Sequence, residues 1–150
     1  MADMPEGEID GSDASLPRAC RKSGTLLVVA GALCRGGTVL ISHRPEGKPM
    51  GGMWEFPGGK VEFSEDPEEA LARELLEELG ISVKGLWPIS FATHEDMVLL
   101  LFRVETWDGE PRGNEGQSIE WVDVDALEQY VMPRVDAALL APLRTSLLIE

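Results

Sequence analysis

Basic residues are scarce in this sequence. Its 150 residues include 13 lysines and arginines against 27 aspartates and glutamates, which gives a formal net charge of −14. So acidic a surface repels the phosphates of nucleic acid polymers and of anionic membranes, and we therefore expect neither as a partner. The charge does not exclude a small phosphorylated ligand, because a bound divalent cation can reverse the local field.

Cysteine and histidine are scarce as well. The two cysteines, Cys20 and Cys34, are too few for a disulfide scaffold or a four-cysteine zinc site. The two histidines, His43 and His94, form no H-x-x-x-H pattern. The longest apolar run, Leu26 to Cys34, is far shorter than a membrane span, and the acidic N-terminus is not typical of a signal or transit peptide. We therefore expect a reduced, cytoplasmic protein.

The composition divides the chain into a tail and one domain. Residues 1–22 combine five acids, three bases and two prolines with little apolar periodicity. Such a segment buries too little apolar surface to offset its ordering entropy. We expect a flexible tail over residues 1–22 and one folded domain over residues 23–150.

Apolar runs alternate with turn signals along the rest of the chain. Runs rich in valine, leucine and isoleucine, bounded by glycine-containing turns, predict strands. We expect strands at 26–34, 38–44, 83–93, 97–107 and 118–124, with a short extended piece at 54–59. A short helix is expected at 125–130, leucine spacing predicts another at 136–148, and 45–53 and 108–117 are predicted loops.

The clearest helix signal lies between these strands. Asp66 suits the N-cap, Pro67 suits the first helical position, and Glu69 completes a capping box. Gly80 is suited to end the helix. The sequence therefore predicts a helix that begins at Pro67 and ends just before Gly80.

Three carboxylates share one face of this helix. At about 100° per residue, Glu74, Glu77 and Glu78 fall within one arc of roughly 100°. An adjoining arc holds the leucines that we expect to face the core, namely Leu71, Leu75, Leu76 and Leu79. Clustered carboxylates beside a Gly-Gly turn suit hard cations such as Mg²⁺, although a solvated acidic helix face would have the same charge pattern.

The spacing of residues 59–81 adds a family resemblance. The pattern G-x5-E-x7-R-E-L-L-E-E-L-G-I resembles the Nudix hydrolase signature at every defined position. The resemblance implies an α/β fold, an α/β/α sandwich with a mixed β-sheet, in which the signature forms a loop–helix–loop. It also implies hydrolysis of a nucleoside diphosphate linked to a further group, with Mg²⁺ or Mn²⁺ as the cofactor.

The same resemblance assigns roles to residues in and near the signature. It implies that Arg73 orients a glutamate, that Glu65 supports the loop, and that Glu74 is the general base while water attacks a phosphorus. The metal ligands that it implies are the carbonyl of Gly58 with Glu74, Glu77 and Glu78, and Glu115 from a remote loop.

The resemblance extends to the MutT type of Nudix hydrolase. Residues 43–62, 107–122 and 132–140 carry this further likeness. It implies hydrolysis of nucleoside triphosphates, notably the mutagenic 8-oxo-dGTP, to the monophosphate and pyrophosphate, which sanitises the nucleotide pool and protects DNA. The substrate-binding residues implied are Arg44, Glu55, Phe56, Pro57, Gly58, Lys60 and Asp136.

The preferred base stays open at this point. An ionised Asp136 only accepts hydrogen bonds, either from the N1–H and N2–H₂ groups of a guanine or from the N4 amine of cytosine. Hydrolysis of (d)CTP or 5-methyl-dCTP is therefore the alternative, and Asp136 could also cap the last helix. A non-catalytic nucleotide-binding Nudix module is disfavoured by the intact glutamates. We expect a monomer that takes a small nucleoside triphosphate.

Overall fold

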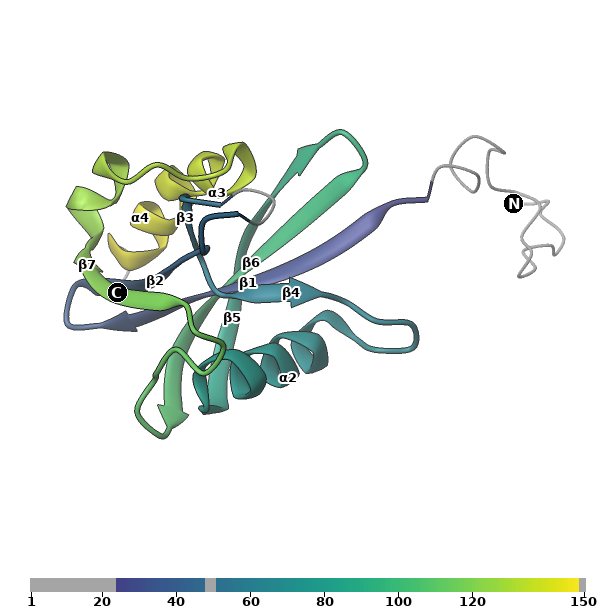
Figure 1. The fold of residues 1–150 in the computed structure, drawn as a ribbon, viewed down its shortest axis with the longest axis horizontal. Coiled ribbons are helices and arrows are strands. Elements are labelled where there is room, and N and C mark those ends of the chain that lie inside the picture. Colours follow the sequence, from purple (N-terminus) through teal and green to yellow (C-terminus); the bar gives the residue numbers. More distant parts are fainter. Residues whose placement is uncertain (1–23, 48–50, 149–150) are drawn as a thin grey trace, which may run out of the picture.

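The computed structural model describes residues 24–47 and 51–148 (Figure 1). The flexible tail predicted at residues 1–22 lies outside the described residues. Three residues of the loop predicted at 45–53 lie outside them as well.

Seven strands form a mixed sheet (Figure 1). They are β1 (Leu26–Arg35), β2 (Thr38–His43), β3 (Trp54–Glu55), β4 (Gly58–Lys60), β5 (Ser82–His94), β6 (Met97–Asp108) and β7 (Ser118–Asp123). The order is β3-β2-β1-β6-β5, with β4 paired to β1 and β7 paired to β2. β1 and β6 run parallel, whereas β1 pairs antiparallel with both β2 and β4. The strands predicted from the apolar runs are confirmed.

One edge of β1 is shared by two partner strands. Residues 28–30 pair with β4, whereas residues 34 and 35 pair with β2. β3 pairs in turn with β2, so the two residues between β3 and β4 connect one partner of β1 to the other. This junction positions the candidate site.

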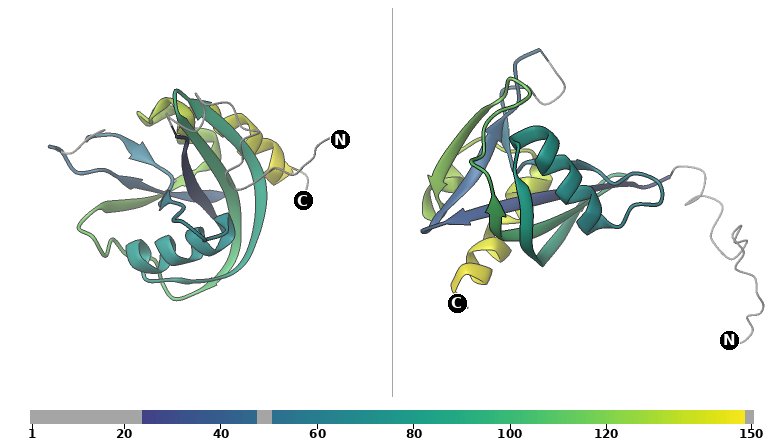
Figure 2. Two further views of the ribbon diagram at one scale, coloured as in Figure 1. Left: turned by 90° about the vertical axis from the view of Figure 1, so that its right-hand side faces the viewer. Right: turned by 90° about the horizontal axis from the view of Figure 1, so that it is seen from below.

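Helices cover both faces of the sheet. α2 (Pro67–Leu79) packs on alternate residues of β1 and β6, which include Val29, Leu33, Phe102 and Val104. The 3-10 helix η1 (Val124–Gln129), α3 (Arg134–Ala138) and α4 (Leu140–Leu148) pack on the intervening residues, which include Ala30, Ala32, Leu99 and Leu101. Successive strand residues point to opposite faces, so the sheet lies between two helical layers (Figure 2). The predicted α/β/α sandwich is confirmed.

α2 begins and ends where the sequence predicts. The backbone N–H of Asp66 donates to Glu69 Oε1 at 3.1 Å, and Gly80 ends the helix in the left-handed conformation at φ 74°. The expectation that Leu76 faces the core is wrong, because its side chain is 57% exposed. The buried stripe follows a spacing of four residues, and position 76 lies about 100° from position 75 towards solvent.

The leucine stripe predicted as one helix at residues 136–148 forms two helices. α3 begins at Arg134, and Leu139 separates it from α4. Asp136 therefore lies inside α3, whose N-cap is Pro133, so the capping role considered for Asp136 is wrong. Among the described residues, no helix has both the length and the apolar character needed to cross a membrane.

Candidate active site

Gly58 and Gly59 permit two close approaches at β4. A Cβ on Gly58 would overlap the backbone carbonyl oxygen of Val29 in β1. A Cβ on Gly59 would overlap the carboxylate of Glu74 in α2. β4 is therefore held against β1 on one side and against the signature helix on the other, and only glycine fits both positions.

The backbone polar groups of Gly58 point away from β1. The carbonyl of Pro57 accepts from Gly31 N–H at 2.9 Å, and Val61 N–H donates to the carbonyl of Leu27 at 2.9 Å. Because these groups alternate in direction along a strand, the N–H and carbonyl of Gly58 face the opposite side. That side holds the carboxylates described below.

Arg73 joins the loop before α2 to the helix. Its guanidinium donates to Glu65 at 2.7 and 3.0 Å, to Glu74 at 3.1 Å and to the carbonyl of Lys60 at 3.1 Å, and it lies 3.6 Å from Glu77. The hydrogen bonds from Arg73 hold the pKa of Glu65 at about 2 and raise the pKa of Arg73 itself. Arg73 thus lies against Glu74, and its role in orienting that glutamate stays a prediction.

The three carboxylates of α2 have different surroundings. The Glu74 side chain is 16% exposed and the Glu77 side chain is 53% exposed, whereas Glu78 lines a pocket. Within residues 24–47 and 51–148, no three histidine, cysteine, aspartate or glutamate side chains converge closely enough to hold one metal ion. The metal-ligand set implied by the resemblance therefore stays a prediction.

The loop after β6 reaches the end of α2 and brings a further carboxylate. The N–H of Asn114 and the Nε2 of Gln117 both donate to the carbonyl oxygen of Glu78, at 3.0 and 3.1 Å. These bonds satisfy a carbonyl in the last turn of the helix. Glu115 lies between the two donors in sequence and lines the same pocket as Glu78.

Glu78 carries the strongest electrostatic perturbation of this cluster. Burial, a hydrogen bond with Glu74 and the charges of Glu74 and Glu115 raise the pKa of Glu78 to about 9, against a lowering effect from the N–H of Gly58. An ionised carboxylate is costly there unless a positive charge lies beside it. Several carboxylates next to a backbone carbonyl are the donor types that hard divalent cations prefer, so the chemistry of these residues suits such an ion, although no three of the described side chains converge on one point.

Two pockets adjoin at the junction between β3 and β4. The polar pocket, of about 180 Å³, is lined by residues that include Arg44, Glu78, Glu115 and Gln117. The large pocket, of about 360 Å³, runs along β1 and has an apolar floor that includes Val28, Ala30 and Leu99. Arg44, Glu55 and Gly58 line both pockets, so a single ligand can reach from one into the other.

Arg44 stands at the boundary between the pockets. Its Nη2 donates to both carboxylate oxygens of Glu55, at 3.0 and 3.2 Å. Its Nε is buried and has no hydrogen-bond partner among the described residues. A buried donor without a partner is uncommon, and an anionic ligand would satisfy it.

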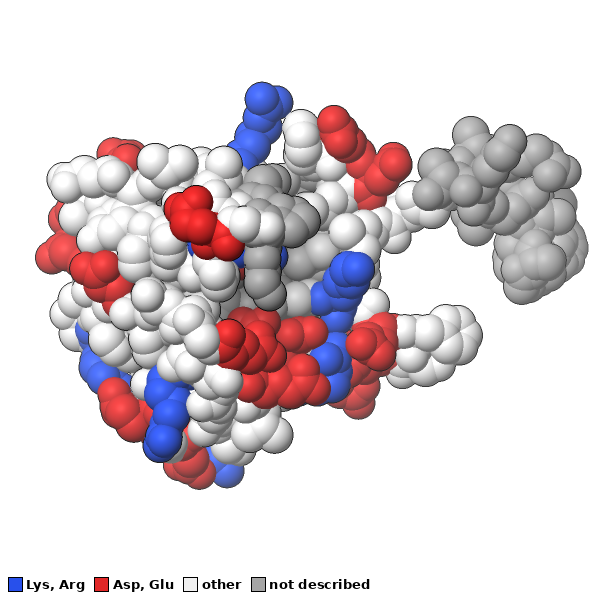
Figure 3. All heavy atoms as spheres, in the orientation of Figure 1, with Lys and Arg blue, Asp and Glu red and all other residues white. Residues whose placement is uncertain are grey.

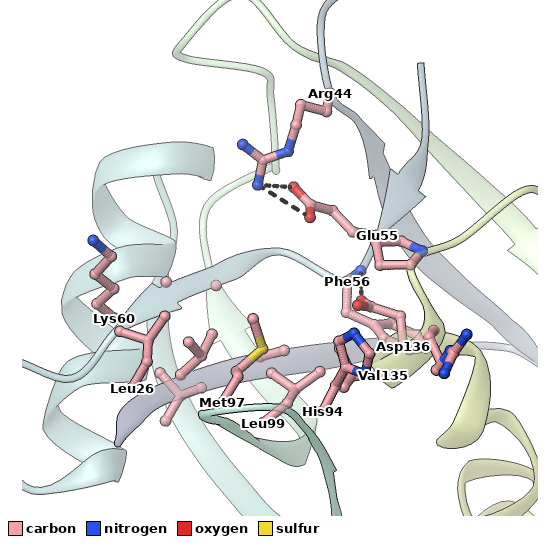
Figure 4. Close-up of a pocket in the computed structure, with 17 residues that line it drawn as sticks. Leu26, Arg44, Glu55, Phe56, Lys60, His94, Met97, Leu99, Val135 and Asp136 are labelled. Atoms are coloured by element: carbon pink, nitrogen blue, oxygen red, sulfur yellow. Dashed lines mark hydrogen bonds and ion pairs between the residues drawn. The ribbon is translucent and has the colours of Figure 1, made fainter. Parts of the chain in front are cut away.

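Asp136 is the buried acid of the large pocket (Figure 4). Its side chain is 5% exposed, and its Oδ2 accepts from the backbone N–H of Phe56 at 3.1 Å. Burial raises the pKa of Asp136 to about 7, the charge of Glu55 adds to this, and the bond from Phe56 and the charge of Arg44 oppose it. Near neutral pH this carboxyl is therefore present in both protonation states. The ionised form only accepts hydrogen bonds, and the protonated form also donates one.

The structure brings together most of the residues implied to bind substrate. Arg44, Glu55, Phe56, Gly58, Lys60 and Asp136 all line the large pocket. Pro57 lines neither pocket, because it is buried with its carbonyl bonded to β1.

Sequence reasoning missed other lining residues. Met97 and His94 line the large pocket, and Gln117 lines the polar one. A histidine at a strand end was the only signal for His94, and nothing local distinguished Met97.

Acidic side chains gather over α2 and the loop that precedes it (Figure 3). They include Glu62, Glu65, Glu74 and Glu77, which all lie near Arg73. A highly charged anion would be repelled from this surface unless cations accompany it.

Comparisons with known proteins match this architecture. The NUDIX domain family model matches residues 25–142. The 8-oxo-dGTP diphosphatase of Escherichia coli (strain K12) is 36% identical over 110 residues, which cover 71% of this chain and 85% of that protein. The CTP pyrophosphohydrolase of the same organism is 36% identical over 120 residues, which cover 75% and 87%.

Solved structures agree in fold. A structure of MutT, from work on Aliivibrio salmonicida and Vibrio cholerae, has a TM-score of 0.67 and 38% sequence identity. The match covers 73% of this chain and 89% of that one.

Proposed function

The chain belongs to the NUDIX domain family and is a MutT-type Nudix hydrolase, and on that premise we propose that it is a Mg²⁺-dependent pyrophosphohydrolase of nucleoside triphosphates. The leading substrate is 8-oxo-dGTP, and the products are 8-oxo-dGMP and pyrophosphate. The name of the E. coli relative supports this substrate. The role is then removal of an oxidised nucleotide from the pool before it enters DNA.

The observation that carries the proposal is the junction of two unlike pockets. The large pocket offers an apolar floor and one buried carboxyl, Asp136, which suit a planar base with polar edges. The polar pocket offers Glu78 and Glu115, which suit cations that accompany phosphates. Arg44 lines both, where the sugar and first phosphate of one bound nucleotide would lie.

The chain's own residues divide the work of hydrolysis. The carbonyl of Gly58 with Glu74, Glu77, Glu78 and Glu115 would hold Mg²⁺, or Mn²⁺ in its place. When held there, Mg²⁺ would supply charge neutralisation on the triphosphate and activation of a water molecule. Arg73 donates a hydrogen bond to the Glu74 carboxylate, which lies against the backbone of Gly59. In that position Glu74 would accept a proton from the attacking water. The water oxygen bonds to phosphorus, one bridging P–O bond breaks, and pyrophosphate leaves with the monophosphate as the second product.

A second substrate class is favoured by the surroundings of Asp136. Burial raises the pKa of this carboxyl to about 7, so near neutrality it can donate one hydrogen bond and accept another. The edge of cytosine presents the N3 acceptor beside the N4 amine donor and matches that arrangement. The CTP pyrophosphohydrolase relative supports (d)CTP as the alternative.

The test is a screen of nucleoside triphosphates for pyrophosphate release. The panel holds 8-oxo-dGTP, dGTP, dCTP and 5-methyl-dCTP, each with Mg²⁺, with Mn²⁺ and with a chelator. We expect 8-oxo-dGTP to have the highest kcat/KM and the chelator to abolish turnover. Two variants of the same helix serve as test and control. Glu78→Gln should be inactive. Glu68→Gln changes an exposed acid in the first turn of the helix and should keep its activity.

The screen also separates the competing classes of protein. A higher kcat/KM for dCTP would transfer the proposal to cytidine nucleotides. Nucleotide binding without pyrophosphate release would indicate the non-catalytic module. Sedimentation of the same sample checks the expected monomer.

A further inference from the structure

The β5–β6 hairpin forms one wall of the large pocket. His94 and Met97 face each other across a two-residue turn, in which Glu95 has φ 55°. The turn is held to the start of β1, because Leu26 N–H donates to the carbonyl of Asp96 at 2.7 Å. The hairpin therefore presents His94 at a fixed position in the pocket wall.

His94 lies at the same end of the pocket as Asp136. In Figure 4 the imidazole of His94 lies on the side of the pocket where Val135 and Asp136 are labelled. Lys60 lies at the opposite end of the pocket. α3, which carries Asp136, packs against β5, which carries His94. The two polar side chains therefore border one part of the pocket from different elements.

Other hydrogen-bond donors also line the pocket, among them Arg44, Lys60 and Arg134. The N–H of Phe56 donates to Asp136, and the guanidinium of Arg44 donates to Glu55. Lys60 lies at the far end (Figure 4). In the described part of the chain, by contrast, neither ring nitrogen of His94 makes a hydrogen bond, since its 3.8 Å contact with the Glu95 carboxylate is too long for one.

A guanine-type base needs a donor beside Asp136. An ionised Asp136 accepts from N1–H and N2–H₂, but the O6 atom next to N1 on the same edge is an acceptor and needs an N–H partner. A neutral imidazole carries one N–H, which its tautomer can present from either nitrogen.

We propose that His94 is a specificity-determining residue of the large pocket, whose imidazole N–H donates to the O6 atom of a guanine-type base while Asp136 accepts from the N–H groups beside it. The proposal rests on the function proposed above. It assigns His94 to recognition of the base and not to the reaction at phosphorus, which takes place beside the polar pocket.

The test compares two nucleotides that differ at one atom. 6-Thio-dGTP keeps the N–H groups that Asp136 would bind, but its sulfur is a much weaker acceptor than O6. His94→Phe keeps an aromatic ring and removes the donor. We expect kcat/KM for dGTP to fall about three- to tenfold through KM, with little loss for 6-thio-dGTP. His94→Gln, which supplies an N–H₂ donor, should recover part of the dGTP loss.

Asp96→Asn is the matched control, because its exposed side chain belongs to the same turn and lines neither pocket. It should retain the kcat/KM of the unmodified protein. An equal loss for both nucleotides in His94→Phe would mean that the ring only packs, and an unchanged dGTP value would exclude contact; either result overturns the proposal. If His94→Phe fails to fold, the same comparison with His94→Leu decides: a loss for dGTP but not for 6-thio-dGTP supports the donor role, and an equal loss or no loss overturns it.

A binding measurement separates this proposal from the proposed function. Calorimetric titration with 8-oxo-dGMP requires no turnover, and His94→Phe should raise Kd about three- to tenfold. Binding that weakens in this way without hydrolysis of any triphosphate would retain the role of His94 and reject the proposed reaction. Failure of the unmodified protein to bind 8-oxo-dGMP would overturn the role of His94.

Discussion

The carboxylate of Asp136 accepts a hydrogen bond from the backbone N–H of Phe56 at 3.1 Å, across 80 residues of sequence. The bond ties α3 to the junction between β3 and β4, which also lies against the carboxylates of α2. One backbone segment, residues 56–59, therefore links the buried acid of the large pocket to the two glycines of β4.

Replacing Asp136 should weaken discrimination between nucleotides more than it weakens the chemistry. Asp136→Ala removes a charged acceptor in a buried pocket, which is worth about 1.5–3 kcal/mol, or a factor of roughly 10–150 in affinity. We expect KM for the preferred nucleotide to rise by that factor while kcat and the values for poor nucleotides change less. Steady-state kinetics with 8-oxo-dGTP, dGTP and dCTP measure this. A uniform fall in all three kcat/KM values would reduce Asp136 to a structural residue.

The stability of the protein should depend on pH through Asp136. Burial raises its pKa in the folded state from 3.8 to about 7, so the folded state binds this proton more tightly than the unfolded state. The proton's contribution to stability is complete below pH 3.8 and is lost as the pH rises through about 7. Asp136→Asn keeps an acceptor for Phe56 but has no proton to lose. The free energy of unfolding, measured in urea, should therefore rise for the variant relative to the unmodified protein between pH 5 and pH 8, by at most about 3 kcal/mol, and nearly all of this rise should occur below pH 7. A constant difference over that range would exclude the effect.

Glu78→Gln should exchange activity for stability. Burial and the neighbouring carboxylates raise the pKa of Glu78 to about 9. At pH 7.5 the metal-free folded protein therefore keeps Glu78 protonated while the unfolded chain ionises it, and this difference lowers the free energy of unfolding. An amide at this position avoids that cost, and we expect a gain of about 1–3 kcal/mol, or several degrees in Tm, in the presence of a chelator. Added Mg²⁺ should raise Tm of the unmodified protein and of Glu68→Gln, but much less that of Glu78→Gln. An equal Mg²⁺-induced shift in all three proteins would argue against a metal site at Glu78.

The two glycines of β4 should respond differently to alanine. In Gly59→Ala the new methyl group meets the Glu74 carboxylate, a side-chain end that can be displaced without moving the backbone, so the fold should persist while kcat falls. In Gly58→Ala the methyl group meets the backbone carbonyl of Val29, which cannot move without disrupting the pairing of β1 with β4. We expect that variant to lose roughly 3 kcal/mol of unfolding free energy. Thermal melts and kinetics on both variants measure the contrast, and equal stability would contradict it.

Local signals in the sequence predicted the elements well, because each signal acts over a few residues. Asp66, Glu69 and Gly80 contact only their own helix ends, so the bounds of α2 were predictable. Leu76 and the division of the last helix at Leu139 were not, because packing against the sheet decides which leucine is buried and where the chain bends. The α/β/α arrangement came from the family resemblance and not from these local signals.

The sequence by itself determined the chemistry available to this protein. It fixed the spacing of Glu74, Glu77 and Glu78 on one helix and the glycines that let β4 approach that helix. Only the tertiary structure decided that Glu78 faces a pocket while Glu77 faces solvent, that Glu115 joins Glu78, and that Asp136 and His94 border the same cavity. These relationships join residues far apart in the chain. They depend on strand pairing and on how the layers pack, which no pattern within a few residues can encode.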